Sequence, residues 1–122
     1  MGYDANNVFA KILRGEIPCT KVYEDDFALA FNDIKPQAPT HILVIPKGPY
    51  TTYDDFVGSA DDKEIVGFHR AVHKVIGAAN IVAGGYRLIS NSGPNAHQEV
   101  PHYHIHIVGG GDVGPMLSAR EK

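Results

Sequence analysis

The sequence predicts an α+β fold, in which a mostly antiparallel sheet of about five strands carries two helices. Three observations support this prediction. Apolar residues alternate with histidines through residues 100–110, further short apolar runs lie between turn residues, and residues 59–80 have helical periodicity. The expected strands follow one another closely while the helices stand apart from them, as in antiparallel α+β sheets. We expect residues 1–122 to form a single domain.

The first expected helix covers residues 4–15. Asp4 or Asn6 can cap its start, and Gly15 ends it. Its apolar residues follow an i, i+1, i+4, i+5 spacing and are Val8, Phe9, Ile12 and Leu13. This spacing predicts a short amphipathic helix.

Four short segments are expected to be strands. Residues 20–24 and 27–33 are joined by an Asp-Asp pair, which predicts two strands with a tight turn between them. Residues 41–46 are apolar on both faces and lie between prolines, and residues 84–91 enter a strand after paired glycines.

The second and longer helix is expected over residues 59–80. Ser59 or Asp61 can cap it, and apolar residues recur at helical spacing at Ile65, Phe68, Val72, Val75, Ile76 and Ala79. His69 and His73 are one turn apart on the expected solvent face, so we assign them no chemistry.

Composition excludes several classes of function. The net charge is −3, which gives no support to binding of a nucleic-acid backbone. The sequence contains no apolar run long enough for a membrane span, and its first residues do not resemble a signal peptide. Cys19 is the single cysteine, which fits a reducing compartment. We expect a cytoplasmic protein that binds neither nucleic acid nor a membrane.

Histidines occupy every second position at His102, His104 and His106. Successive side chains of a strand point to opposite faces, so the three imidazoles share one face at intervals of about 7 Å. The residues between them are then directed into the core, and these are Tyr103, Ile105 and Ile107.

Spacing alone leaves two functional interpretations of these histidines open, besides a surface strand without function. Two imidazoles of a His-x-His pair can bind one Zn²⁺, but the third would be too distant and His97, Glu99 or His41 would have to complete the site. Alternatively, a neutral imidazole can act as a nucleophile, with phosphorus as a natural target. The polar loop before the strand could then offer donors to phosphate oxygens.

Residues 102–108 match the His-x-His-x-His-x-x motif, with apolar x, and so resemble the histidine triad (HIT) superfamily. Residues 11–47, 85–91 and 109–117 are similar to its nucleotide-binding branch, the last in its bacterial form. The resemblance covers about nine-tenths of the chain. It implies a HIT-like fold and a homodimer in which the sheets of two subunits join.

The resemblance also implies roles for four histidines. His104 matches the nucleophile that attacks the α-phosphorus of a nucleotide. His106 matches the histidine that contacts phosphate oxygens or the leaving group, whereas His102 and His41 match supporting residues.

Further residues match the nucleotide-binding positions of the family. Asp33 matches the acid that binds the ribose hydroxyls, and Asn91 and Gln98 match polar positions near the phosphate. Glu99 departs from the family, in which this position is often Ser, and its charge leads us to expect it to face the leaving amine rather than the phosphate. The expected contacts of the base are Val8, Phe9, Ile12, Phe31, Asn32 and Ile34.

The implied activity is hydrolysis of purine nucleoside 5′-monophosphoramidates through a nucleotidyl-histidine on His104. Alternatives are a nucleotide-binding protein with little turnover and a dinucleoside polyphosphate hydrolase. No cofactor is expected. Asn7 and Ala10 stand where zinc-binding members of the family begin their site with Cys-x-x-Cys, so we expect no metal.

Overall fold

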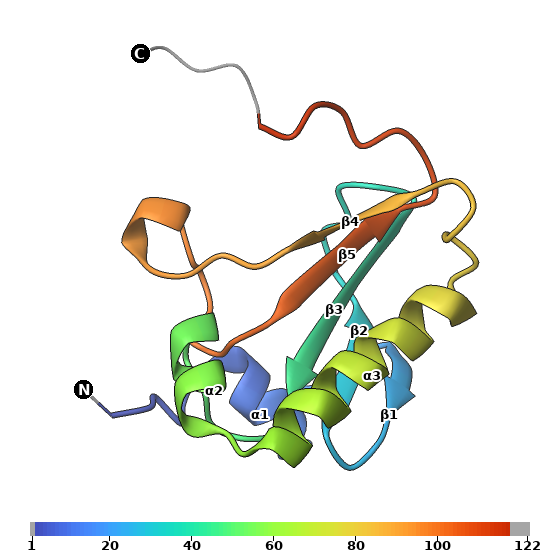
Figure 1. The fold of residues 1–122 in the computed structure, drawn as a ribbon. Helices are drawn as coiled ribbons and strands as arrows, with labels where there is room; N and C mark the ends of the chain where they lie inside the picture. The colour runs from blue at the N-terminus through green and yellow to red at the C-terminus, as the bar shows by residue number, and fades with distance from the viewer. Residues whose placement is uncertain (1, 118–122) are drawn as a thin grey trace.

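The computed structural model describes residues 2–117 of the chain and has a five-stranded sheet at its centre (Figure 1). Every pair of neighbouring strands is antiparallel. In their order across the sheet, the strands are β1 (Lys21–Glu24), β2 (Ala28–Asn32), β3 (Thr40–Pro46), β5 (Ile105–Gly109) and β4 (Tyr86–Ile89). The predicted α+β fold is confirmed. Met1 and residues 118–122 of the expected domain lie outside the described residues.

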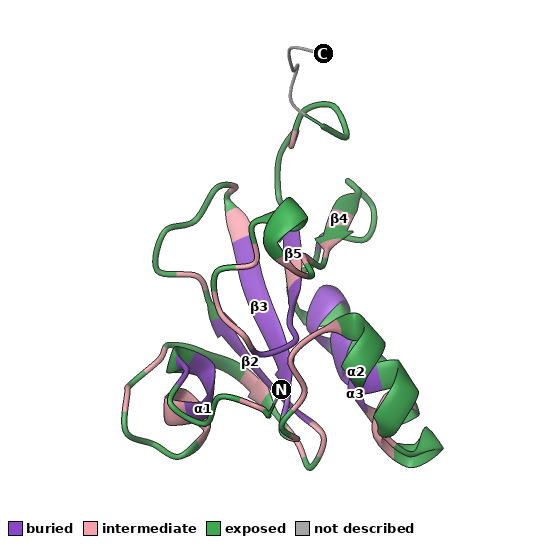
Figure 2. Cartoon of the chain, turned by 90° about the vertical axis from the view of Figure 1, so that its left-hand side faces the viewer, coloured by how far each residue is buried: buried purple, intermediate pink, exposed green. Residues whose placement is uncertain are grey.

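The long helix α3 (Asp62–Ala78) covers one face of the sheet (Figures 1 and 2). The carboxylate of Asp61 caps it by accepting a hydrogen bond from the N–H of Glu64 at 2.8 Å. The buried side of α3 packs on apolar residues of the sheet and consists of Phe68, Ala71, Val72, Val75 and Ile76. Within residues 2–117, no helix is both long enough and apolar enough to span a membrane.

The short helix α1 (Val8–Leu13) lies on the opposite face (Figure 2). Its cap is Asn7, whose Oδ1 accepts the N–H of Ala10 at 2.8 Å, so the prediction of Asp4 or Asn6 as the cap was wrong. The expected end at Gly15 is confirmed, because this residue has φ +79° just after the helix. Phe9 of α1 packs into a second apolar cluster with Leu29, Phe31, Leu43 and Ile45.

The sequence did not predict the helix α2 (Tyr53–Ser59), which Thr52 caps. Its only buried residue is Phe56, whose ring stacks on Tyr103 with centroids 5.1 Å apart and also contacts Phe68. A helix that buries a single side chain shows no apolar period, and for that reason it escaped detection. A 3₁₀ turn, η1 (Pro94–Ala96), lies within the expected loop.

The histidine segment is a strand only from Ile105 onward, so the prediction of a strand that also contains His102 and His104 was wrong. Continuing the β3–β5 register beyond Val44 and Ile105 would pair Tyr103 with Pro46, which has no N–H to donate. The N–H of Tyr103 instead donates to the carbonyl of Tyr50 at 2.7 Å.

The alternation of faces nevertheless persists through this segment. The apolar residues Tyr103, Ile105 and Ile107 belong to the core beneath α3, as expected. The rings of His102 and His104 contact Phe9 of α1 on the other side of the sheet.

Candidate active site

A cavity of about 640 Å³ opens on the α1 side of the sheet. Its walls come from α1, the segment after β2 and the loop before β5, and His104 and His106 also line it. His41 and His102 lie behind this lining, only 5% and 0% exposed. Every residue expected to bind the nucleotide lines the cavity: Val8, Phe9, Ile12, Phe31, Asn32, Asp33, Ile34, Asn91, Gln98 and Glu99. Lining residues that were not predicted to bind it are Ile17, Pro18, Cys19, Lys35, Gln37, Leu43, Ala96, His97 and Val100.

The ring of His104 is held by its own chain. Its Nδ1 lies 2.6 Å from the carbonyl oxygen of His102, and since a carbonyl only accepts, Nδ1 carries the proton. The other nitrogen, Nε2, therefore has a free lone pair in the neutral ring. Phe9 packs edge-on against this ring, with centroids 5.0 Å apart. Burial lowers the pKa of His104 below its usual range, so the ring is neutral at pH 7.

His106 belongs to a relay of hydrogen bonds that begins in the segment after β2. The N–H of Gln37 donates to Nδ1 of His41 at 3.0 Å, so the proton of the neutral His41 ring is on Nε2. This Nε2–H lies 2.9 Å from Nδ1 of His106 and donates to it. His106 then carries its own proton on Nε2. Burial, and next the neighbouring His104 and His41, lower the pKa of His106 to about 4.

Asp33 lies beside this relay, with Oδ2 3.4 Å from Nε2 of His41. Its other oxygen accepts the N–H of Lys35 at 2.8 Å, which fixes the carboxylate at the edge of the cavity. One ligand atom from each of Asp33, His41 and His106 lies within 4.8 Å of the others, as a metal site would require. However, two nitrogens bound to one tetrahedral zinc would be about 3.3 Å apart. The 2.9 Å between His41 and His106 is the length of a hydrogen bond, so these side chains fit a proton relay better than a chelate.

His102 is anchored at both ring nitrogens. Nε2 donates to the carbonyl of Pro46 at 2.9 Å, and Nδ1 accepts the phenol O–H of Tyr3. Burial is the main reason why the pKa of His102 falls to about 4. The group that this residue offers to His104 is thus its main-chain carbonyl, while its ring holds the segment in place.

The loop before β5 is fastened by the side chain of Gln98. Its Oε1 accepts the N–H of Gly93 at 2.9 Å, and its Nε2 donates to the carbonyls of Thr51 and Val100. This network shapes the rim of the cavity. Glu99 follows on the exposed side, and its charge acts to raise the pKa of His104, although burial outweighs this effect.

The family model of the HIT domain matches residues 14–113, which include the relay, the cavity lining after α1 and the three histidines. The chain belongs to the HIT family. This HIT protein is 60% identical over 116 residues to an uncharacterized 13.2 kDa HIT-like protein of Azospirillum brasilense, and the match covers 95% of each chain. The predicted membership of the superfamily is therefore confirmed.

Two further relatives of this HIT protein have names that refer to an activity. It is 46% identical over 112 residues to the purine nucleoside phosphoramidase of Escherichia coli (strain K12), with 91% of this chain and 92% of that protein covered. The crystal structure of a HIT family hydrolase from Legionella pneumophila superposes with a TM-score of 0.81 at 43% identity, covering 88% of this chain and 95% of that one.

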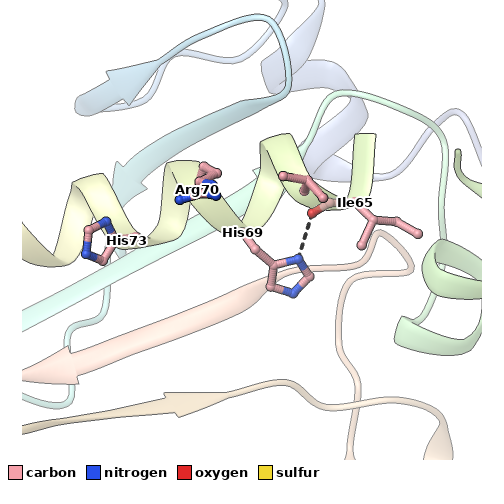
Figure 3. Close-up of a pocket in the computed structure, with 5 residues that line it drawn as sticks. Ile65, His69, Arg70 and His73 are labelled. Carbon is pink, nitrogen blue, oxygen red and sulfur yellow. Dashed lines mark hydrogen bonds between the residues drawn. The ribbon is translucent and has the colours of Figure 1, made fainter. Parts of the chain in front are cut away.

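A second and smaller cavity of this HIT protein, about 380 Å³, lies over α3 (Figure 3). None of the three triad histidines lines it. Ile65, Val66, His69, Arg70 and His73 line it. Both histidines are exposed, as predicted, and His69 donates from Nδ1 to the carbonyl of Ile65 at 2.7 Å. They lie on the helix that covers the opposite face of the sheet from α1.

Proposed function

We propose that this protein hydrolyses purine nucleoside 5′-monophosphoramidates, with His104 as the nucleophile. The observation that carries the proposal is the fixed tautomer of His104. Its Nδ1–H is bound to the carbonyl of His102, so a neutral ring offers the lone pair of Nε2 to a phosphorus atom in the cavity. The name of the Escherichia coli relative, purine nucleoside phosphoramidase, supports the same reaction.

In the first step, Nε2 of His104 bonds to the α-phosphorus while the P–N bond to the amine breaks. The leaving nitrogen takes up a proton from solvent in the open cavity, so the amine departs as a neutral molecule and a nucleotidyl-histidine remains. Positive charge develops on the imidazole, and the bond from Nδ1–H to the carbonyl of His102 strengthens as it does so. The Nε2–H of His106 is a donor for a phosphate oxygen or for the leaving nitrogen. In the second step water attacks phosphorus and gives a proton to solvent, the electron pair of the N–P bond returns to Nε2 of His104, and the nucleotide is released.

The cavity offers suitable chemistry for the nucleoside. Val8, Phe9 and Ile12 of α1 form an apolar wall for a purine base. The Asp33 carboxylate accepts hydrogen bonds from the vicinal hydroxyls of ribose, and Asn91 lies near the phosphate. Gln98 acts there through the loop that it fastens, because both of its N–H groups already donate to carbonyls.

The proposal includes a homodimer in which β4 is the joining strand. β4 is at the edge of the sheet, and an unpaired strand edge is a template for another chain. Exposed apolar side chains on β4 support this assembly, namely Tyr86 and Leu88. Sedimentation equilibrium tests it, and a monomer mass at micromolar concentration would refute it.

Steady-state turnover of an adenosine 5′-phosphoramidate, compared with a diadenosine polyphosphate, tests the activity. We expect the phosphoramidate to be preferred and, after rapid acid-free quenching, a nucleotidyl adduct on the peptide that contains His104. Preference for the polyphosphate would assign a different substrate class. Binding of AMP without turnover of either compound would identify a binding protein instead.

A further inference from the structure

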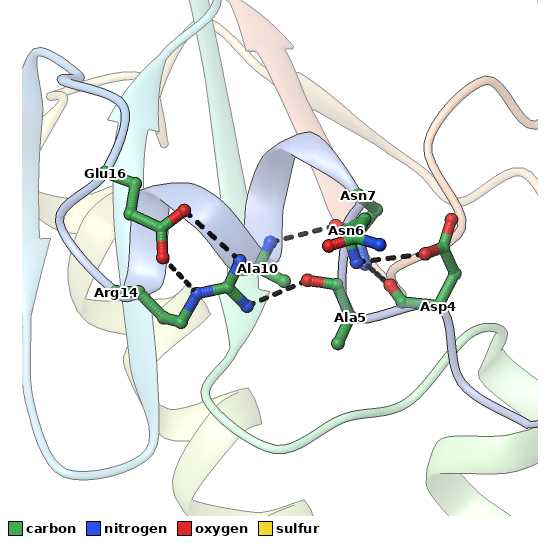
Figure 4. A network of polar contacts seen from close by, with 7 residues as sticks. All are labelled: Asp4, Ala5, Asn6, Asn7, Ala10, Arg14 and Glu16. Carbon is green, nitrogen blue, oxygen red and sulfur yellow. Dashed lines mark hydrogen bonds and ion pairs between the residues drawn. The ribbon is translucent and has the colours of Figure 1, made fainter.

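The residues that precede α1 form a turn that is fastened to the helix (Figure 4). Arg14, at the end of α1, donates from Nη1 to the carbonyl of Ala5 at 2.8 Å and is itself held by Glu16. Asn7 donates from Nδ2 to the carbonyl of Asp4 at 2.7 Å. These contacts fix the direction in which the chain approaches α1 from its N-terminal end.

This turn brings Tyr3 against His102, which is 99 positions away in the sequence. The phenol O–H of Tyr3 donates to Nδ1 of His102, and the two rings pack edge to face with centroids 5.6 Å apart. Asn7 donates from Nδ2 to the phenol oxygen at 2.9 Å, which orients the hydroxyl proton toward the histidine. With Nε2 on the carbonyl of Pro46, the imidazole of His102 is bound at both ends.

We propose that Tyr3 and Asn7 are positioning residues for the nucleophile His104, and that they act through His102. The carbonyl that holds Nδ1–H of His104 belongs to His102, so whatever fixes the side chain of His102 also limits the movement of this carbonyl. The inference rests on the proposed function, since it assigns these residues a part in the attack by Nε2.

Loss of the phenol hydroxyl would leave Nδ1 of His102 buried without its donor. An unsatisfied buried acceptor is unfavourable, and the ring relieves it by shifting toward other donors. The His102 carbonyl then shifts too, and the hydrogen bond that supports the developing imidazolium of His104 is weakened. Since the walls of the nucleoside cavity remain, the effect belongs to the chemical step and not to substrate binding.

The test is Tyr3→Phe, with Tyr50→Phe as the matched control. The Tyr50 phenol is also part-buried and also hydrogen-bonded, but to Glu64 at the start of α3. We expect Tyr3→Phe to lower kcat about three- to tenfold while KM changes by less than about twofold, and Tyr50→Phe to retain the wild-type kcat. Asn7→Ser keeps a cap for α1 but removes the amide donor to Tyr3, and its kcat should lie between those of Tyr3→Phe and Tyr50→Phe.

Nuclear magnetic resonance of the ring nitrogens measures the positioning without reference to activity. In Tyr3→Phe, the ¹⁵N resonance of His102 Nδ1 should move toward the value of a free acceptor, and the Nδ1 proton of His104 should exchange faster with water. An unchanged Nδ1 resonance of His102, an unchanged exchange rate at His104, or a kcat equal to that of Tyr50→Phe would each overturn the proposal. If the wild type turns over no phosphoramidate, the proposed function fails, whereas the exchange rate at His104 still decides whether Tyr3 positions this ring.

Discussion

Acidification below pH 6.5 should destabilise this protein through His102, whose ring is buried in the neutral form. Its pKa is about 4 in the folded chain, because burial disfavours the charged ring, whereas the ordinary pKa of a histidine, which applies in the unfolded chain, is 6.5. Between these values the unfolded chain binds more protons than the folded chain, so the free energy of unfolding decreases as the pH falls. Above pH 6.5 both states are neutral at this residue, and the contribution to the pH dependence disappears.

The magnitude follows from the two pKa values. Each unit of difference is worth about 1.4 kcal/mol, so the full shift corresponds to about 3 kcal/mol once the pH is below 4. Most of this change occurs between pH 7 and pH 5. Over that range, linkage predicts that His102 alone lowers the free energy of unfolding by about 2 kcal/mol.

Urea unfolding of the wild type and of His102→Gln at pH 7 and pH 5 isolates the contribution of His102 to the free energy of unfolding. Glutamine keeps a donor for the carbonyl of Pro46 but does not titrate, and the other histidines contribute equally to both proteins. Between pH 7 and pH 5, we expect the free energy of unfolding of the wild type to fall by about 2 kcal/mol more than that of the variant. Equal losses would show that His102 is not buried in its neutral form, which would refute the reasoning.

Four further predictions concern activity. His104→Gly should lower turnover about a thousandfold or more and keep AMP binding, since the walls of the cavity are intact; turnover within tenfold of wild type would exclude covalent catalysis. Dialysis against EDTA should leave activity unchanged, because His41 and His106 share a hydrogen bond; a loss that Zn²⁺ restores would contradict this. Asp33→Asn should raise KM about tenfold for a ribonucleotide substrate and much less for its 2′,3′-dideoxy analogue, and equal effects would remove Asp33 from the ribose site. Glu99→Ser should reduce the preference for cationic over anionic amine leaving groups, and an unchanged ratio of kcat/KM would leave Glu99 without a selective role.

The sheet and its two main helices could be predicted because each of them buries a continuous face, and burial leaves a period in the sequence. The helix α2 buries only Phe56 and left no such signal. The start of β5 could not be placed either, because it depends on Pro46 in a strand that is distant in the sequence. Local alternation is the same on both sides of Ile105, and only the hydrogen-bonding partner changes.

The sequence predicted the roles of some residues in the candidate site and gave no indication of others. The alternation of histidines indicated one face, and the family resemblance suggested which histidine attacks. The contacts of Tyr3 had no signal in the sequence, because a single tyrosine near the start of the chain matches no motif and reaches His102 only through the turn before α1.

The four histidines carry identical side chains, and their different chemistry comes from the atoms that meet each ring nitrogen. A carbonyl places the proton of His104 on Nδ1, whereas the N–H of Gln37 places the proton of His41 on Nε2. His106 takes its tautomer in turn from His41. The carbonyl of Pro46 and the phenol of Tyr3 decide the tautomer of His102. Spacing in the sequence can therefore predict which imidazoles are neighbours. Which ring nitrogen carries a lone pair and which carries a proton is decided by main-chain groups that only the folded sheet brings to these rings.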